Sequence, residues 1–380
     1  MFDADTRQLA FKLRHGMRPS ALFDGRPGAE IFKVEARHVG GHLREAVVGE
    51  GAGGSAWRFL SDEGLHLKGT DLAPFPFGYF NAGLQSDLMR CLRNAAVARA
   101  VALDSLELTL DNEYWLTGSF ALGTGRGFAA PTRIEIRIGS AAPADTVADV
   151  VKAAVAASPA LALLRMPLTN TFALYINGRR RRVAAGAASP AADVADPFLK
   201  YAAAPQAVEP VSIVPVEKCA MREAGEITIA PAATTTRITR KVTGRGRLLD
   251  ASGLCEIETW LQLPGMSHFL FRTDESAEDR APSGLALVSA GLAFCYMTQL
   301  ARYVEGMQLG VDSIRLVQFS PFANGTAAGF DTHLFLNGDA PESAQSNLLS
   351  IAARTCYLHA TMGDALTPLI SLRHNGIALD

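Results

Sequence analysis

The sequence predicts an α+β protein made of two tandem units, each with the element order β-β-β-α-β-β-α-β. One observation is an internal repeat in the 380-residue chain, where Ala82–Leu110 aligns without gaps on Ala290–Gln318, with eight identities in 29 positions. The other is a change of pattern that occurs in both units. Alternating apolar and polar residues, typical of strands, give way to a long apolar run, typical of a buried helix.

The flanks of the aligned segments extend the repeat. Trp57–Glu63 (WRFLSDE) is similar to Phe269–Glu275 (FLFRTDE), and Pro74 aligns with Pro282. Because these landmarks recur in the same order at a shift of about 200 residues, we interpret the chain as a duplication.

The elements follow in order within each unit. Alternating segments such as Ile238–Leu249 and Cys255–Leu263 predict the first strands. A long helix begins after Pro74 or Pro282, since Pro suits the first turn of a helix. The remaining elements of the two units are two strands, a second helix and a closing strand: 105–110, 132–138, 145–164 and 171–176, then 313–319, 332–336, 343–362 and 368–372.

Three regions follow from this pattern. Residues 1–182 form the first unit, and residues 237–380 form the second unit. Residues 183–236 between them are rich in Ala and Pro, which is typical of a linker or an extended crossover.

The central helix of the second unit, Pro282–Val304, has the length and apolar character of a membrane span. Gly, Ser, Thr and Gln dilute the apolar run, and the aligned segment Ala82–Ala100 carries Asp, Arg and Asn. We therefore predict a helix buried in a protein core and no membrane partner.

Composition narrows the classes of function. A formal charge of −2 and a pI near 6.5 give no electrostatic reason to expect a nucleic-acid partner. The N-terminal residues carry acids early and have no apolar signal region, so we expect a cytoplasmic protein. Five Cys without regular spacing do not form a disulfide scaffold. His359 lies three residues after Cys356, but further ligands at suitable spacing are lacking, so we expect no metal and no other cofactor.

Two thiols in the second unit are the candidates for chemistry. Cys295 lies in the middle of the apolar helix, and Cys356 lies in the second helix among small and apolar residues. Both are expected to point inward, and the residues alone leave open whether they only pack in the core or react.

This arrangement resembles the OsmC/Ohr family of osmotically inducible and organic hydroperoxide resistance proteins. The resemblance rests on a strand-rich start, a buried helix with a Cys, and a second Cys about 60 residues later. The segment Val242–Leu254 (VTGRGRLLDASGL) is similar to an early Gly-rich hairpin of the hydroperoxide reductases. The resemblance implies a thiol peroxidase without a cofactor. Cys295 would attack the peroxide, Cys356 would resolve the sulfenic acid as a disulfide, and a dithiol reductant would reset the pair.

A buried thiol needs a nearby cation to react as a thiolate. Arg245, or Arg247 two positions on, is the candidate that the resemblance implies. The family's carboxylate at the start of the helix is missing here, so Glu275 or Glu278 would have to replace it. The expected substrate pocket comprises Arg247, Phe294, Tyr357 and Phe77.

The first unit lacks the thiol pair, because Asp87 aligns with Cys295 and Ala160 with Cys356. Since family members are intertwined homodimers, the resemblance implies that the two units form a pseudo-dimer within one chain, with buried central helices and one live site. Two such chains could associate further. The alternative function is a non-catalytic protein of the same fold that binds a hydrophobic small molecule.

Overall fold

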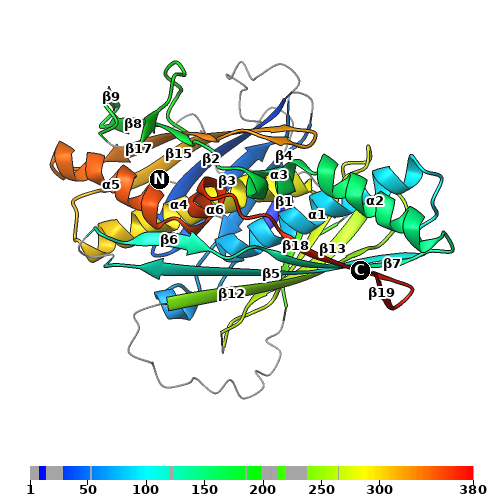
Figure 1. Cartoon of the computed structure of the whole chain (residues 1–380). Helices are drawn as coiled ribbons and strands as arrows, with labels where there is room; N and C mark the ends of the chain where they lie inside the picture. The colour runs from blue at the N-terminus through cyan, green and yellow to red at the C-terminus, as the bar shows by residue number, and fades with distance from the viewer. Residues whose placement is uncertain are drawn as a thin grey trace.

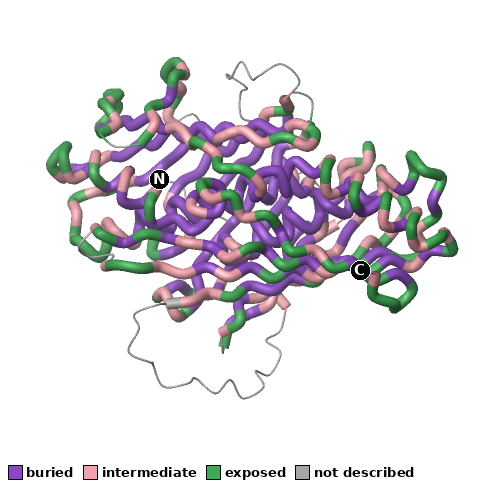
Figure 2. The backbone as a smooth tube through the Cα atoms, viewed as in Figure 1, coloured by how far each residue is buried: buried purple, intermediate pink, exposed green. Residues whose placement is uncertain are grey.

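The structure is a computed structural model that describes residues 8–13, 29–51, 54–119, 123–184, 186–197, 207, 213–219, 238–263 and 265–379. The α+β class is confirmed. Two mixed β-sheets of ten and nine strands lie on either side of a layer of helices (Figure 1). The interior between the sheets is buried, and the exposed residues lie at the ends and outer faces (Figure 2).

The helices are α1 (Pro76–Val97), α2 (Ala144–Ala157), α3 (Pro159–Arg165), α4 (Gly284–Gly306), α5 (Glu342–Thr355) and α6 (Tyr357–Gly363). The strands of the first sheet are β1 (Ala10–Lys12), β2 (Glu30–Gly40), β3 (Leu43–Gly49), β4 (Ala56–Ser61), β8 (Thr171–Ile176), β9 (Arg179–Arg181), β10 (Ala187–Ala188), β15 (Ser313–Ala323), β16 (Thr326–Ala327) and β17 (Asp331–Asn337). The strands of the second sheet are β5 (Ser105–Thr117), β6 (Arg126–Ala129), β7 (Arg133–Gly139), β11 (Val216–Lys218), β12 (Ile238–Leu248), β13 (Leu254–Leu261), β14 (Phe269–Asp274), β18 (Leu369–His374) and β19 (Ile377–Leu379).

Both sheets combine strands from the two halves of the chain. The first has the order β4-β3-β2-β15-β17-β8 along most of its width, and the second has the order β14-β13-β12-β5-β7-β18. The junctions are the antiparallel pairs β2–β15 and β12–β5. In each sheet, three strands from the start of one half therefore lie next to two strands of the other half. These are β4-β3-β2 beside β15-β17 in the first sheet, and β14-β13-β12 beside β5-β7 in the second.

The predicted second helix of each half is broken into two helices. The break falls at Ser158 between α2 and α3, and at Cys356 between α5 and α6, and both residues have extended backbone angles. Pro159 explains the first break, because a residue before Pro disfavours the helical region. Cys356 thus lies at a helix junction and not within a helix, and its counterpart in the first half is Ser158 and not Ala160.

The central helices α1 and α4 cross at glycines. A Cβ atom on Gly83 would lie 2.7 Å from the carbonyl oxygen of Gly284, and one on Gly291 would lie 2.8 Å from the backbone nitrogen of Phe80. Gly83 and Gly291 are the equivalent residues of the repeated Ala-Gly-Leu sequence. Each central helix therefore has a small residue at the point where the two backbones approach.

Among the described residues, α4 is the single helix that is long and apolar enough on its own to cross a membrane. The apolar window of this helix is entirely buried inside the fold. The predicted linker is described only in part. Within it, β10 pairs with β8 at the edge of the first sheet, and Asp196 accepts hydrogen bonds at 2.6 and 2.7 Å from the Arg315 guanidinium. The predicted boundaries of the three regions stay a prediction.

Candidate functional site

The structure brings together the two thiols that the sequence singled out. The Sγ atoms of Cys295, in α4, and Cys356, at the start of α6, lie 3.3 Å apart. Both residues are buried, and both are free thiols. A shift of little more than an ångström would bring the sulfurs to the ~2.05 Å of a disulfide bond. The pair is therefore placed for reversible bond formation.

The two sulfurs share a buried environment but differ in their electrostatics. Burial and the neighbouring Cys356 sulfur raise the pKa of Cys295 well above its usual value. Burial also acts to raise the pKa of Cys356. The thiol of Cys295, the His359 ring and the His359 backbone N–H outweigh this effect and hold the pKa of Cys356 well below its usual value. In the reduced pair, Cys356 is the sulfur that gives up its proton more readily.

The first turn of α6 turns backbone donors toward the sulfurs. The N–H of Leu358 acts on Cys295, and the N–H of His359 acts on Cys356, and each lowers the pKa of its thiol. The extended conformation at Cys356 leaves these N–H groups without partners inside the helix. The helix break that sequence reasoning missed therefore serves the site directly.

A buried ion pair from the first half of the chain lies beside Cys295. Arg44, in β3, is fully buried, and its Nη1 lies 4.0 Å from Oε1 of Glu63, just after β4. The Thr298 hydroxyl of α4 donates a hydrogen bond of 2.7 Å to the same carboxylate oxygen. Burial lowers the pKa of Arg44, and the charges of Glu63, Asp62 and Cys295 oppose this effect. Arg44 is thus close enough to interact with a Cys295 thiolate.

The arginines that the resemblance implied lie elsewhere. Side chains at Gly244 and Gly246 would collide with residues of α1, so this face of β12 meets the helix. Since side chains alternate along a strand, Arg245 and Arg247 point to the opposite face of the sheet. The Arg245 guanidinium lies 5.5 Å from the centre of the Trp260 ring, and Arg247 pairs with Glu256 at 2.9 Å. Neither contacts Cys295, and the carboxylate near that thiol is Glu63 and not Glu275 or Glu278.

A small cleft of about 50 Å³ leads to Cys295. Of the predicted pocket residues, Phe77 and Tyr357 line it, with ring centres 5.5 Å apart, whereas Phe294 packs against Tyr79 in the core. Arg240 and Arg302 also line the cleft. Cys295 reaches this opening, and Cys356 lies behind it.

The position in the first half that corresponds to the two thiols is occupied by Asp87 and Ser158. It therefore holds side-chain oxygen atoms where the second half holds sulfur atoms. The Ser158 hydroxyl, at the α2–α3 break, donates a hydrogen bond of 2.5 Å to the Asp87 carboxylate in α1. Asp87 also accepts from Arg90, whose Nε lies 3.8 Å from Oε2 of Glu275. Cys91 is close by, but burial first and the charge of Asp87 second raise its pKa to about 12. The position of Asp87 and Ser158 therefore has no pair of thiols.

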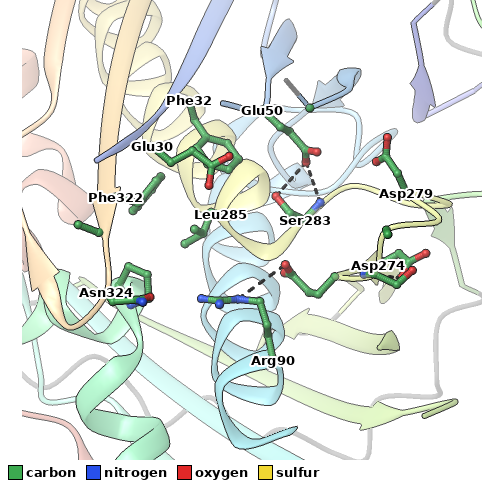
Figure 3. A pocket seen from close by; sticks show the side chains of 16 residues that line it. Glu30, Phe32, Glu50, Arg90, Asp274, Asp279, Ser283, Leu285, Phe322 and Asn324 are labelled. Atoms are coloured by element: carbon green, nitrogen blue, oxygen red, sulfur yellow. Dashed lines mark hydrogen bonds and ion pairs between the residues drawn. The ribbon is translucent and has the colours of Figure 1, made fainter. Parts of the chain in front are cut away.

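An acidic cavity of about 460 Å³, lined in part by Arg90 and Pro159, opens beside the Asp87–Ser158 pair (Figure 3). Arg90 lies on one wall, and Glu50 on another accepts hydrogen bonds of 2.8 and 2.9 Å from the backbone N–H and hydroxyl of Ser283 (Figure 3). Across the described ranges, no group of three or more His, Cys, Asp or Glu side chains is arranged to hold a metal ion.

Comparisons with known proteins give one match. No family model matches the chain, and no curated protein matches it. Among solved structures, the chain is similar to an OsmC-like hydroperoxide resistance protein from Jannaschia sp. CCS1, with 23% identity. The match covers 37% of this chain and 98% of that protein, with a TM-score of 0.25. A match of this size does not establish the family of the chain.

Proposed function

We propose that the chain is an OsmC-like thiol peroxidase that reduces organic hydroperoxides with Cys295 and Cys356. The observation that carries the proposal is the 3.3 Å separation of the two sulfurs, with Cys295 at the floor of a cleft. Buried Cys is common in protein cores, but two thiols in contact beside a buried arginine suit reversible oxidation.

The reaction has three steps. The Cys295 sulfur attacks one peroxide oxygen, the O–O bond breaks, and the thiol proton leaves with the alkoxide as an alcohol. The product at Cys295 is a sulfenic acid. The Cys356 sulfur then attacks the Cys295 sulfur, forming a disulfide and releasing water. A dithiol reductant returns both sulfurs to thiols and becomes a disulfide itself.

Arg44 and Glu63 have distinct roles in this proposal. The Arg44 charge favours the thiolate form of Cys295 and the developing negative charge on the leaving oxygen. Glu63 accepts from Thr298 and lies within ion-pair distance of Arg44, which fixes the position of the guanidinium. The cationic side of the cleft, with Arg240 and Arg302, gives the site a positive field.

The proposal includes a pseudo-dimer of two tandem OsmC-like units within one chain. Three features support it: the equal strand orders of the two sheets, the crossing of α1 and α4 at equivalent glycines, and the Asp87–Ser158 pair at the place equivalent to the dithiol. In this arrangement one unit supplies the thiols and the other supplies Arg44 and Glu63. The first unit is then part of the live site.

The alternative function, binding of a hydrophobic small molecule, has less support. Pockets for drug-sized ligands usually measure ~300–1,000 Å³. The cleft at Cys295 measures about 50 Å³, which suits the reacting end of a peroxide better than a whole ligand.

One experiment tests the proposed function. Reduced protein receives one equivalent of cumene hydroperoxide, is quenched with acid and alkylated, and its thiols are mapped by mass spectrometry. We expect a Cys295–Cys356 disulfide. Cys295→Ser should abolish oxidation, and Cys356→Ser should leave a sulfenic acid at Cys295 that dimedone traps.

The chain supplies its own reference thiol. Cys219 is only partly buried and is free, and Cys255→Ser serves as the control for replacement of a buried Cys. If Cys295 oxidises no faster than Cys219, the chain is not a peroxidase.

A further inference from the structure

His42 contacts both terminal nitrogens of the Arg44 guanidinium beside the thiol pair. Nη1 of Arg44 donates a hydrogen bond of 2.7 Å to the His42 carbonyl oxygen, and Nη2 lies 3.3 Å from Nδ1 of the His42 ring. His42 lies in the turn before β3, two residues ahead of Arg44. Both residues are buried, with His42 5% and Arg44 0% exposed. One residue therefore supplies two acceptors to one buried cation.

These contacts fix the position of the proton on the His42 ring. An arginine side chain has hydrogen-bond donors and no acceptor, so Nδ1 of His42 must be the acceptor and carries no proton. The proton of a neutral ring then lies on Nε2. Oε2 of Glu305, in α4, lies 3.9 Å from this nitrogen, and a carboxylate on that side favours a proton there. The ring is therefore the tautomer protonated on Nε2.

Burial keeps the His42 ring uncharged at neutral pH. The titratable and charged side chains that face it are Arg44 from β3, Arg302 and Glu305 from α4, Asp62 just after β4, and His66 from the short 3-10 helix that follows. Burial, followed by the charge of Arg44, lowers the pKa of His42 to about 4, although Glu305 and Asp62 act to raise it. A neutral acceptor holds Arg44 without cancelling its charge, whereas a carboxylate would neutralise it.

Side-chain contacts connect the Arg44 guanidinium with the helix that carries Cys295. Nη1 of Arg44 lies 4.0 Å from Oε1 of Glu63, and the same oxygen accepts the 2.7 Å hydrogen bond from Thr298. Thr298 follows Cys295 by three residues on α4, and both line the cleft together with Glu63. Nε of Arg44 is buried and has no hydrogen-bond partner among the residues that the structure describes. Since buried donors are nearly always paired, this N–H offers a contact to a thiolate or a peroxide oxygen.

We propose that His42 is the positioning residue for Arg44 in the reaction at Cys295. This inference rests on the proposed function, in which Arg44 favours the thiolate form of Cys295. His42 occupies the two terminal nitrogens, fixes the direction of the guanidinium and leaves Nε for the site. No bond and no proton of the reaction passes through His42, so its loss changes the rate of the reaction and not the products.

The test compares two replacements of the ring. In His42→Asn the side-chain oxygen takes the place of Nδ1 as an acceptor, whereas His42→Leu has no acceptor. Reduced protein is alkylated with iodoacetamide across a range of pH, and mass spectrometry gives the rate at Cys295, which follows the thiolate fraction of this residue. We expect His42→Leu to react about tenfold more slowly, the scale of a lost hydrogen bond to a charged group, and His42→Asn to react like the wild type. Oxidation by cumene hydroperoxide should follow the same order.

His374→Leu is the matched control. It removes another buried imidazole, one that bonds the Ser140 carbonyl oxygen at 2.9 Å in β18, and it should leave the alkylation rate of Cys295 unchanged. A wild-type alkylation rate in His42→Leu overturns the inference. Equal slowing in His42→Leu and His42→Asn also overturns it, because the packing of the ring and not its acceptor would then set the rate.

The alkylation rates keep this inference apart from the proposed function. If cumene hydroperoxide does not oxidise Cys295, the proposed peroxidase fails, and the order of the alkylation rates still decides the role of His42. If His42→Leu does not fold, ¹⁵N NMR of the reduced wild type decides. The His42 ring should carry one proton, on Nε2. A proton on Nδ1, in a neutral or a charged ring, overturns the inference, because that nitrogen could not then accept from Arg44.

Discussion

Arg44 and Glu63 form a buried ion pair, with 4.0 Å between Nη1 and Oε1, beside a thiol that lies more than two hundred residues away in the sequence. Arg44 lies in β3 and Glu63 just after β4, both in the first half, whereas Cys295 lies in the central helix of the other half. The candidate site is therefore completed by the half of the chain that has no thiol pair.

Replacement of Arg44 should impair the site and the fold together. Arg44→Met removes the cation near Cys295, and we expect oxidation by cumene hydroperoxide to slow by about 100-fold. It also leaves Glu63 buried without its charge partner, which should lower the free energy of unfolding by ~3–5 kcal/mol. Urea denaturation measures the loss of stability.

The double variant Arg44→Met/Glu63→Gln separates the two effects, because it removes the unpaired charge but keeps an acceptor for Thr298. It should regain most of the stability and none of the rate. Arg245→Met is the matched control on the outer face of the second sheet. Oxidation of Arg44→Met at the wild-type rate would contradict the role given to Arg44.

The crossing of the central helices predicts a steric effect. In Gly83→Ala the new methyl group would meet the Gly284 carbonyl oxygen and the Val288 backbone nitrogen, each at 2.7 Å. Backbone atoms cannot rotate away, so α1 and α4 must separate, and we expect a loss of ~1–3 kcal/mol. Thermal and urea unfolding measure it. Gly306→Ala, at the end of α4 with nothing within 4 Å, should be at least as stable as the wild type. Equal stability of the two variants would count against the close crossing.

Glu50 predicts how stability depends on pH. Burial raises the pKa of its carboxyl to about 8, although the hydrogen bonds from Ser283 act to lower it. The folded chain therefore holds a proton that the unfolded chain releases above its usual pKa of ~4.3. The stabilising contribution is complete below that value and is lost as the pH rises to about 8, a change on the order of 4 kcal/mol.

Glu50→Gln keeps an acceptor for Ser283 and cannot ionise. Its free energy of unfolding should fall less steeply between about pH 5 and about pH 8 than that of the wild type, by the amount assigned to Glu50. Urea titrations across this range provide the comparison, with Glu278→Gln, an exposed carboxylate, as control. Parallel curves for wild type and Glu50→Gln would show that Glu50 is ionised in the folded chain.

The hydrogen-bonded pair of Asp87 and Ser158 in the first half predicts that a second disulfide can be engineered there. Asp87 and Ser158 hold atoms 2.5 Å apart, at a helix and a helix break that match those of Cys295 and Cys356. The double variant Asp87→Cys/Ser158→Cys should therefore form a disulfide when treated with diamide, detected by mass spectrometry. Ser158→Cys alone should not. Failure of the double variant, while Cys295 and Cys356 oxidise fully, would mean that the two places differ in backbone geometry.

Much of the fold could be predicted from local patterns. The order of strands and helices follows from alternation and apolar runs, and the repeat relates Gly83 to Gly291 at the crossing. The pairing of Cys295 with Cys356 was implied by the resemblance to the OsmC/Ohr family. The small and apolar residues around both thiols predicted only that they face inward.

The arginine of the site could not be found in this way. The alternation of apolar and polar residues shows which residues form a strand. It does not show which strand of the other half will pair with it, as β2 pairs with β15 and β12 with β5. The Gly residues beside Arg245 suggested a turn, whereas in β12 they make room for α1 and send Arg245 outward. The sequence did contain a signal for Glu63. Glu63 matches Glu275 in the repeated Asp-Glu sequence, and it could have been found by assigning to the thiols the carboxylate of the opposite half of the chain.

The shared sheets have a consequence for how the chain is made. During synthesis the first half leaves the ribosome before β12 and β15 exist, so β5 and β2 each have one unpaired edge, and α1 has no α4 to pack against. At ~5–20 residues per second, apolar surface then stays open for many seconds. Folding must wait for the second half, and a chaperone that shields the nascent first half should raise the yield of active protein.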